Sequence, residues 1–391
     1  MTGIRMRRRL LSAALLAAVI MLAAACGGPA APATGEPQEP GDMPEDPPAA
    51  GDSPSTGGEY GQRDPDTGVA ALPPLDPPEP LRIAEDGSPS GAGFYIATER
   101  GYFAELGLEP EFVTFESSAY MFPAVAGGDV DVAGGVMTAS LLNAVDRGLP
   151  LRIIADKGRN RPGASYFDLV RSTRVIDEIQ TLEDIRGRRF AITSEGSVDH
   201  IFAELALRAG GLTEEEVEWV VIRDFGQMNP ALANGSVDVA MHIEPLITAG
   251  EADGVLDRWI DATEFAPDFQ VAVVLASPAF TQERQEVARR FMVAYLKGLR
   301  DYYAAFVEGV DTDEIIDIMT RHTPMKDPEL WRRVNKVDLN PDGYVIADSV
   351  QFQVEWFKEK GLYAGDVTAA DLIDHSLVDF AIEYLGGPVG Q

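Results

Sequence analysis

The chain has 391 residues, of which 45% are hydrophobic, and a formal net charge of −31. This length is enough for more than one domain. The excess of acidic groups excludes nucleic acid as a partner, because phosphate binding requires a positively charged surface. Beyond that, surplus acid only keeps an exported protein soluble.

Residues 1–25 are typical of a secretory signal, with four arginines between positions 5 and 9, an apolar run over 10–22 and three alanines before Cys26. The apolar run is shorter than the ~20 residues of a transmembrane helix. Cys26 is the only cysteine, so no internal disulfide can form. The segment resembles a bacterial lipoprotein signal, which implies that lipidated Cys26 anchors the chain to the outer face of the cell membrane. A plain secretory signal followed by a chance cysteine is the alternative.

Residues 26–80 form the next segment, which is rich in proline and acid. The stretch 27–80 contains 14 of the 27 prolines and 11 acidic residues against one basic residue, Arg63. With few large apolar side chains, such a segment cannot bury enough surface to offset its chain entropy. We predict an extended tether without regular secondary structure or a ligand site.

The folded body is predicted to begin at Leu81. Strands are expected at 81–84, 111–115 and 129–133, and helices at 94–105 and 118–126. This β-α-β-α-β order is typical of a mostly parallel sheet covered by helices.

A second copy of this unit follows. Eight of eleven residues recur when 123–133 is laid over 230–240, 107 positions later. The second copy predicts strands at 189–193, 218–222 and 237–241, with helices at 198–209 and 227–233. Two similar halves imply two lobes with a cleft between them, and clefts are common ligand sites.

The remaining segments complete the predicted domain division. We interpret 166–170 and 269–276 as the segments that cross between the lobes. Helices are expected at 282–307, 313–321, 328–334, 350–360 and 369–385. Lobe I would then comprise 81–170 and 270–391, and lobe II 171–269.

At this point the sequence resembles a known family. The segments that carry the resemblance are 101–108, 124–135, 181–191, Gly196-Ser197 and 238–245, within roughly residues 81–300. They are similar to the α/β, periplasmic-binding-protein type 2 fold and to the solute-binding proteins of ABC importers for nitrate, sulfonate, taurine and thiamine-pyrimidine precursors. The resemblance implies two lobes that close over a small solute, with a permease and its ATPase as partners. Where many relatives carry Trp-Glu-Pro, this chain has His242-Ile243-Glu244-Pro245.

Candidate ligand-binding residues follow from the rule that open α/β sheets bind ligands beyond the carboxyl ends of their strands. Serine and glycine there leave hydroxyl and backbone N–H groups free at helix N-termini. For any single serine, simple helix capping is the alternative. The candidates are Ser88, Ser90, Phe94, Ser117, Ser118, Tyr120, Gly135, Met137, Thr138, Ser194, Gly196, Ser197, His200, Gln227, His242 and Glu244. We expect Glu244→Ala or Ser197→Ala to weaken ligand binding without unfolding the body.

The charge of these loops bears on the ligand. They carry Asp86, Glu116, Glu195, Asp199 and Glu244 but no lysine or arginine, although Lys157, Arg159 and Arg161 are nearby. We therefore favour a neutral or partly cationic, nitrogen-containing molecule, such as a pyrimidine, over nitrate or a sulfonate.

Enzymatic functions are less favoured. Ser197, Asp199 and His200 are close in sequence, but neighbours at one helix start do not point at one another as a catalytic triad requires. The four histidines lack metal-ligand spacing, so no metal or cofactor is expected, although His200 and His242 meeting across the cleft is an alternative. A pyrimidine-transforming enzyme of the same fold and a ligand-sensing domain remain the alternative functions.

Overall fold

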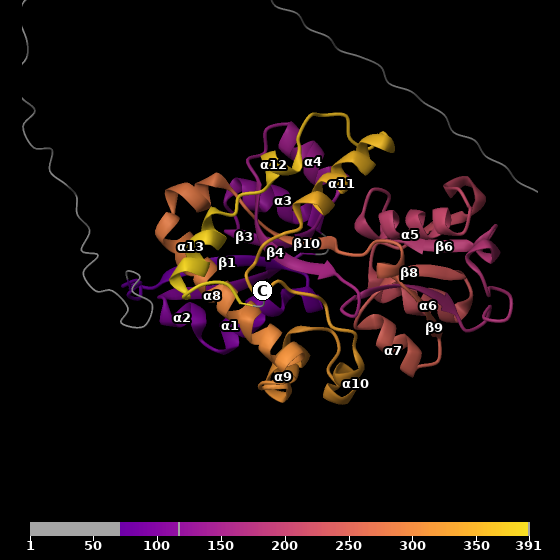
Figure 1. The fold of residues 1–391 in the computed structure, drawn as a ribbon, viewed down its shortest axis with the longest axis horizontal. Helices are drawn as coiled ribbons and strands as arrows, with labels where there is room; N and C mark the ends of the chain where they lie inside the picture. Colours follow the sequence, from indigo (N-terminus) through magenta and orange to yellow (C-terminus); the bar gives the residue numbers. More distant parts are fainter. Residues whose placement is uncertain (1–70, 116–117, 390–391) are drawn as a thin grey trace, which may run out of the picture. The chain divides into compact units, whose positions relative to one another are not determined.

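The computed structural model of this chain describes residues 71–115 and 118–389. Its strands form two five-stranded sheets, with the orders β2-β1-β3-β10-β4 and β7-β6-β8-β5-β9. The first sheet contains β1 (Glu79–Glu85), β2 (Leu108–Thr114), β3 (Val132–Val136), β4 (Arg152–Asn160) and β10 (Phe269–Ala276). The second contains β5 (Phe167–Ser172), β6 (Arg189–Ile192), β7 (Glu218–Val221), β8 (Val239–Ile243) and β9 (Leu256–Asp261). Figure 1 shows both sheets with their helices.

In each sheet one strand runs against the other four. β1 is parallel to β2 and β3, whereas β10 is antiparallel to β3 and β4. Likewise β6 is parallel to β7 and β8, and β5 is antiparallel to β8 and β9. The reversed strands, β5 and β10, are those that the chain enters directly after crossing from the other sheet. β4 and β9 end at the carboxyl edges of their sheets. Because β5 and β10 are antiparallel to their neighbours, each of them begins at the carboxyl edge of its own sheet. Both crossings therefore join the two carboxyl edges.

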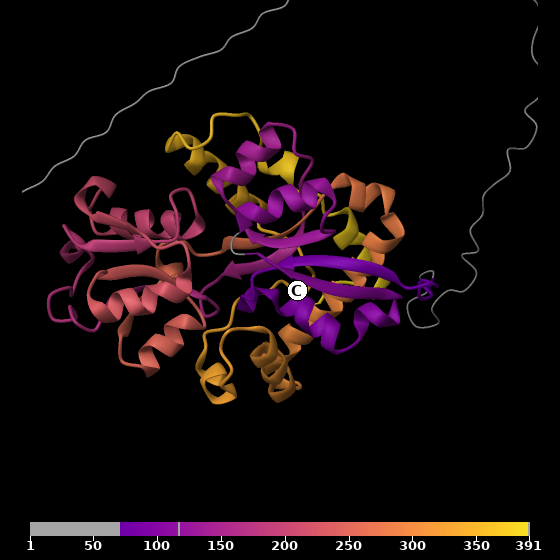
Figure 2. The ribbon, with the colours of Figure 1, turned by 180° about the vertical axis from the view of Figure 1, so that it is seen from behind.

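Helices cover both faces of each sheet. On the first sheet, α1 (Ala92–Glu99), α2 (Tyr102–Glu105), α8 (Gln285–Tyr303) and α13 (Ser376–Tyr384) pack together on one face. On the other face lie α3 (Ser118–Gly127), α4 (Ala139–Asp146) and α11 (Ala347–Glu359). Figure 2 shows the strands of the first sheet between these two layers. The bulk of the apolar core lies here, including Phe94, Phe291 and Tyr295.

The second sheet is covered by α5 (Val198–Ala209) on one face and by α6 (Met228–Asn234) and α7 (Leu246–Ala252) on the other. Successive side chains of β8 point to opposite faces of the sheet. Met241 belongs to the main apolar core, with the residues of α5, whereas Ala240 belongs to a smaller cluster with Met228 of α6 and Ile247 of α7. The remaining helices are α9 (Thr312–His322), α10 (Pro328–Arg333) and α12 (Ala369–Leu372).

Two of the predicted helices are interrupted, and the end of the predicted tether is structured. The helix expected over 94–105 breaks at Gly101, whose φ of +76° is left-handed. The helix expected over 369–385 is divided into α12 and α13, because Asp374 donates its N–H to the carbonyl of Ile153 on β4 (2.9 Å). The end of the predicted tether packs on the body: Leu75 donates its N–H to Leu106, and Pro73 accepts from Arg290.

The predicted division into lobes stays a prediction, but the strands show which segments of the chain form each sheet. Those of the first sheet lie within 79–160 and 269–276, and those of the second within 167–261. The segments expected to cross between the lobes are thus largely strands β5 and β10, and the crossings themselves are 161–166 and 262–268.

The repeated sequence builds the same structural clip in both sheets. Asp131 accepts the backbone N–H of Arg82 (2.7 Å), and Asp238 accepts that of Arg189 (3.0 Å), 107 positions later. Both arginines also donate to the carbonyl of the left-handed glycine that ends the preceding helix, Gly128 or Gly235. These groups precede β3 and β8, away from the carboxyl edges. The repeat therefore stabilises each sheet and does not belong to the candidate site.

Candidate functional site

Contacts between the two halves meet at the carboxyl edges of the sheets. Ala139, at the start of α4, donates its N–H to the carbonyl of Gly196 (3.2 Å). Asn335, after α10, donates its N–H to the carboxylate of Glu244 (3.1 Å). Two of the predicted site residues, Gly196 and Glu244, thus contact segments packed with the first sheet.

A buried lysine organises the edge of the first sheet. Lys157 on β4 is 1% exposed, and its Nζ lies 3.1 Å from Glu85 Oε1 at the end of β1. The same Nζ donates to Ser88 Oγ (3.1 Å) and Ser90 Oγ (2.9 Å). Gly134 on β3 makes room for it, since a Cβ there would lie 2.3 Å from Lys157 Cε. The predicted residues Ser88 and Ser90 therefore lie together, and both of their hydroxyl groups accept hydrogen bonds from Lys157.

Two carboxyl groups at this edge differ in charge. Burial raises the pKa of Glu85 to about 8, and Lys157 opposes that shift only in part. The pKa of Asp86 is lowered: burial acts to raise it, but Lys157 and hydrogen bonds from Glu85 and Ser88 outweigh that effect. Asp86 is therefore the anion, and its side chain is 37% exposed.

The other predicted residues of the first sheet differ in their burial and local contacts. Thr138 caps α4 by accepting the N–H of Leu141 (3.2 Å). Gly135 and Met137 are buried, and Tyr120 on α3 is 64% exposed. Phe94 is fully buried and packs on Tyr295, with ring centroids 4.7 Å apart, so it presents no surface to a ligand. Ser118 begins α3, while Ser117 lies outside the described residues.

The start of α5 is a closed network of hydrogen bonds. The hydroxyl of Ser197 contacts both the carbonyl of Ser194 (2.7 Å) and the carboxylate of Asp199. Asp199 also accepts from the backbone and hydroxyl of Thr193. Burial raises the pKa of Asp199. Ser197 is 5% exposed, and its hydroxyl is held within this network without making a capping hydrogen bond to α5, whereas Ser194 is half-buried.

His200 holds the Gly196 loop against the other half of the chain. Its Nδ1 accepts the N–H of Gly196 (3.1 Å), and its Nε2 lies 2.9 Å from Glu214. Its ring is packed edge-on by Trp219 and Trp356, each with centroids 5.2 Å away. Asp199 therefore bonds to Ser197 while His200 faces elsewhere, and these residues do not form a catalytic triad.

Glu244 is the centre of a second buried network. It is 0% exposed and accepts from the N–H (3.0 Å) and hydroxyl (2.9 Å) of Thr248. It also pairs with Arg258 on β9, which in turn pairs with Asp168 and with Glu251 (3.2 Å). The structure therefore predicts that Glu244→Ala destabilises the body, whatever its effect on ligand binding, because the substitution would leave Arg258 short of a partner.

His242 lies beside this network and is equally buried. Its Nε2 bonds to Asn229 Oδ1 (3.1 Å), and its ring stacks on Phe225 with centroids 6.0 Å apart. Burial lowers the pKa of His242 to about 3, and burial raises that of its cross-strand neighbour Asp168 to about 7. At neutral pH the ring is uncharged. The predicted residue Gln227, in contrast, is exposed.

Four participants were not among the predicted site residues: Lys157, Asp168, Arg258 and Asn335. Lys157 lies in Asp156-Lys157-Gly158-Arg159-Asn160, a polar run that continues strand β4 with every residue buried. Such a run in a strand was the available signal, since buried charges require partners. Arg258 gave no comparable signal, because its partners lie 7 to 90 positions away.

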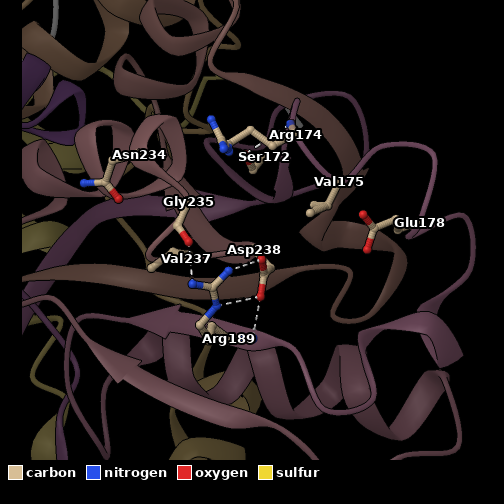
Figure 3. A pocket seen from close by; sticks show the side chains of 9 residues that line it. All are labelled: Ser172, Arg174, Val175, Glu178, Arg189, Asn234, Gly235, Val237 and Asp238. Atoms are coloured by element: carbon tan, nitrogen blue, oxygen red, sulfur yellow. Dashed lines mark hydrogen bonds and ion pairs between the residues drawn. The ribbon is translucent and has the colours of Figure 1, made fainter.

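A surface pocket of about 280 Å³ lies elsewhere, beside the repeated clip (Figure 3). In Figure 3 the guanidinium of Arg189 donates hydrogen bonds to Asp238 and to the carbonyl of Gly235. These polar groups of the pocket are therefore already bonded to one another. The pocket lining consists of Ser172, Arg174, Val175, Glu178, Arg189, Asn234, Gly235, Val237 and Asp238. None of the predicted ligand residues contributes to it.

Residues 71–115 and 118–389 contain neither a candidate metal site nor a membrane-spanning helix. That part of the chain contains no group of three or more His, Cys, Asp or Glu placed to hold a metal ion. None of its helices is long and apolar enough to cross a membrane. Cys26 and the predicted signal lie outside the described residues.

Comparison with known proteins identifies both family and fold. The sequence model of the family described as NMT1/THI5 like matches residues 88–305. No curated protein matches the chain. The fold is similar to that of the alkanesulfonate-binding protein SsuA from Xanthomonas axonopodis pv. citri, with 16% identity over 76% of this chain and 99% of that one, and a TM-score of 0.61.

Two further solved structures extend the comparison. The nitrate-binding protein NrtA from Synechocystis PCC 6803 gives 14% identity, coverage of 78% and 89%, and a TM-score of 0.65. The ligand-binding component of an ABC-type import system from Staphylococcus aureus gives 15% identity, coverage of 78% and 99%, and a TM-score of 0.65. At these identities the likeness establishes the periplasmic-binding-protein fold, as the sequence predicted.

Proposed function

Since the chain belongs to the NMT1/THI5-like family, we propose that it is the extracytoplasmic solute-binding lipoprotein of an ABC importer. In this proposal Cys26 carries the lipid anchor, and the body captures a small organic solute and delivers it to a permease with its ATPase. The named neighbours of the same fold are binding proteins, including one component of an ABC-type import system.

The observation that carries this proposal is the position of the two crossings. Residues 161–166 and 262–268 join the sheets at their carboxyl edges, where open α/β sheets bind ligands. Two short connections between two packed halves form a hinge. Both halves then contribute contacts to a solute held between them, and the closed form is the state that gains binding energy.

The solute we favour is pyrimidine-like or another nitrogen-containing molecule. Lys157 and Arg159 are both buried near the carboxyl end of β4, and both are paired. The N–H groups of Lys157 are directed at Glu85, Ser88 and Ser90, and Arg159 pairs with Asp338. A sulfonate or nitrate, as named for SsuA and NrtA, is the competing ligand class.

An enzymatic role receives less support from the side chains. Ser197, Asp199 and His200 are committed to the α5 loop, and His242 is buried against Asn229 and Phe225. None of them presents an activated nucleophile. We therefore assign binding, not turnover, to this chain.

Native mass spectrometry of the full chain, purified from its own host, tests the proposal. We expect a non-covalent adduct of one small molecule per chain that is released intact on denaturation. Absence of any adduct, together with no binding of compounds extracted from the host medium, would contradict a solute-binding role.

A further inference from the structure

The buried cation at the edge of the first sheet is outnumbered by carboxyl groups. Lys157 Nζ lies 3.1 Å from Glu85 Oε1 and 3.9 Å from Asp86 Oδ1. Its other contacts, Ser88 Oγ and Ser90 Oγ, take up its remaining donor capacity, since an ammonium group has three N–H donors. Lys157 therefore offers no N–H group to a solute, whereas the carboxylate of Asp86 is partly exposed.

The second sheet repeats this imbalance. Arg258 pairs with three carboxyl groups, those of Asp168, Glu244 and Glu251. Asp168 and Glu244 are both fully buried, so they hold the guanidinium inside the network. A solute at this edge meets no free guanidinium group from Arg258.

Several other cations near the edges are also committed. Arg159 pairs with Asp338, and Lys336 donates to the carbonyls of Trp331 and Val334 at the end of α10. Arg223, which follows β7, is exposed and makes no hydrogen bond or ion pair with the rest of the described chain. For an anionic solute, an exposed side chain such as Arg223 is a weak partner, because its charge is screened by salt.

We propose that the solute carries a protonated nitrogen and no anionic group, and that Asp86 is the specificity-determining residue that receives this nitrogen. The inference rests on the proposed solute-binding function and narrows its ligand class. Lys157 is a positioning residue in this scheme: it draws Glu85 and the two serines together and leaves the Asp86 carboxylate facing outward. The Asp86 carboxylate at the first edge and the carboxyl groups around Arg258 at the second then disfavour sulfonates and nitrate.

A cationic and an anionic probe that share a 3-substituted pyridine ring test the charge preference directly. We would titrate the purified full chain with 3-(aminomethyl)pyridine, which is a cation at pH 7, and with pyridine-3-sulfonate, and would add nitrate as a third probe. The amine is expected to bind at least about tenfold more tightly than the sulfonate. Asp86→Asn should weaken amine binding by about tenfold or more and strengthen sulfonate binding. Arg223→Gln is the matched control and should leave amine binding unchanged.

The opposite results distinguish a failure of the charge preference from a failure of the proposed solute-binding function. Sulfonate or nitrate binding as tight as amine binding, especially if Arg223→Gln abolishes it, would overturn the charge preference while leaving a solute-binding function intact. If neither probe binds, the co-purifying molecule decides: a protonated nitrogen supports the inference, and an anionic group overturns it. If nothing binds and nothing co-purifies, the proposed function fails and the inference fails with it.

Discussion

Replacing Glu244 with alanine should destabilise the fold by about 4 kcal/mol. The carboxylate is 0% exposed, accepts two hydrogen bonds from Thr248 and one from Asn335, and pairs with Arg258, which is 21% exposed. Removing one partner of a buried ion pair typically costs about 3–5 kcal/mol, because the remaining charge stays buried without compensation. The structure places Glu244 at the high end of single-substitution effects.

Glu251→Ala is the matched control for this prediction. Glu251 contacts the same guanidinium at 3.2 Å, but its side chain is 32% exposed. Partly exposed pairs contribute about 0–1 kcal/mol, so the control should cost no more than that.

Guanidinium-induced unfolding of the full chain, followed by tryptophan fluorescence, measures both variants. Trp259 adjoins Arg258 on β9 and reports on this sheet. If Glu244→Ala lowers the free energy of unfolding by no more than Glu251→Ala does, Glu244 is not the centre of a stabilising network. Glu244 would then be better explained as a residue that contacts the ligand, as the sequence predicts.

Three further predictions concern buried groups and glycines. His242 has a pKa of about 3 in the fold against about 6.5 when unfolded, so the unfolded chain takes up a proton first and stability falls as pH drops from 6.5 towards 3. His242→Phe should make that fall shallower by up to ~1.4 kcal/mol per pH unit, measured by urea unfolding at pH 6 and pH 4. Gly134→Ala should cost about 1–3 kcal/mol by chemical denaturation, because its Cβ would lie 2.3 Å from Lys157 Cε. Gly128→Ala and Gly235→Ala should each lower stability by about 1–2 kcal/mol in thermal unfolding, since both have φ near +80°.

Each of these predictions has an outcome that would contradict it. An unchanged pH slope in His242→Phe would mean that the histidine is not the group held neutral by burial. For Gly134→Ala the control is Gly127→Ala, where the added Cβ meets only Asp129 at 3.9 Å, and equal costs would refute the argument. No loss of stability in Gly128→Ala, where the added Cβ meets nothing within 4 Å, would refute the argument from the left-handed backbone.

The sequence predicted the fold well where local pattern and chain order agree. The repeat at 107 positions marks equivalent helix ends and strands in both sheets, α3 with β3 and α6 with β8. Pattern alone did not reveal β9 (Leu256–Asp261), since its sequence mixes charged and apolar residues. Nor did it extend β4 through Asp156-Lys157-Gly158-Arg159-Asn160, whose polar side chains are buried only because Glu85 and Asp338 supply partners from distant segments.

The sequence predicted where the candidate loops lie on the sheets, but it did not predict which side chains their residues contact. Loop position follows from topology, so Ser88, Ser90 and Gly196 were placed at the carboxyl edges by strand order alone. The roles of Glu244 and His200 depend on Arg258, Asn335 and Trp356, which lie between 14 and 156 positions away along the chain. No local pattern carries such pairings, and a single sequence does not display them.

The central claim is that this chain binds its solute without transforming it. The most direct measurement is a titration of the full chain with the molecule identified from the native adduct, followed by recovery of that molecule after prolonged incubation with a trace of protein. The account predicts saturation at one solute per chain and recovery of the excess solute unchanged. Accumulation of a product in excess of the protein would contradict it and identify the chain as an enzyme of this fold.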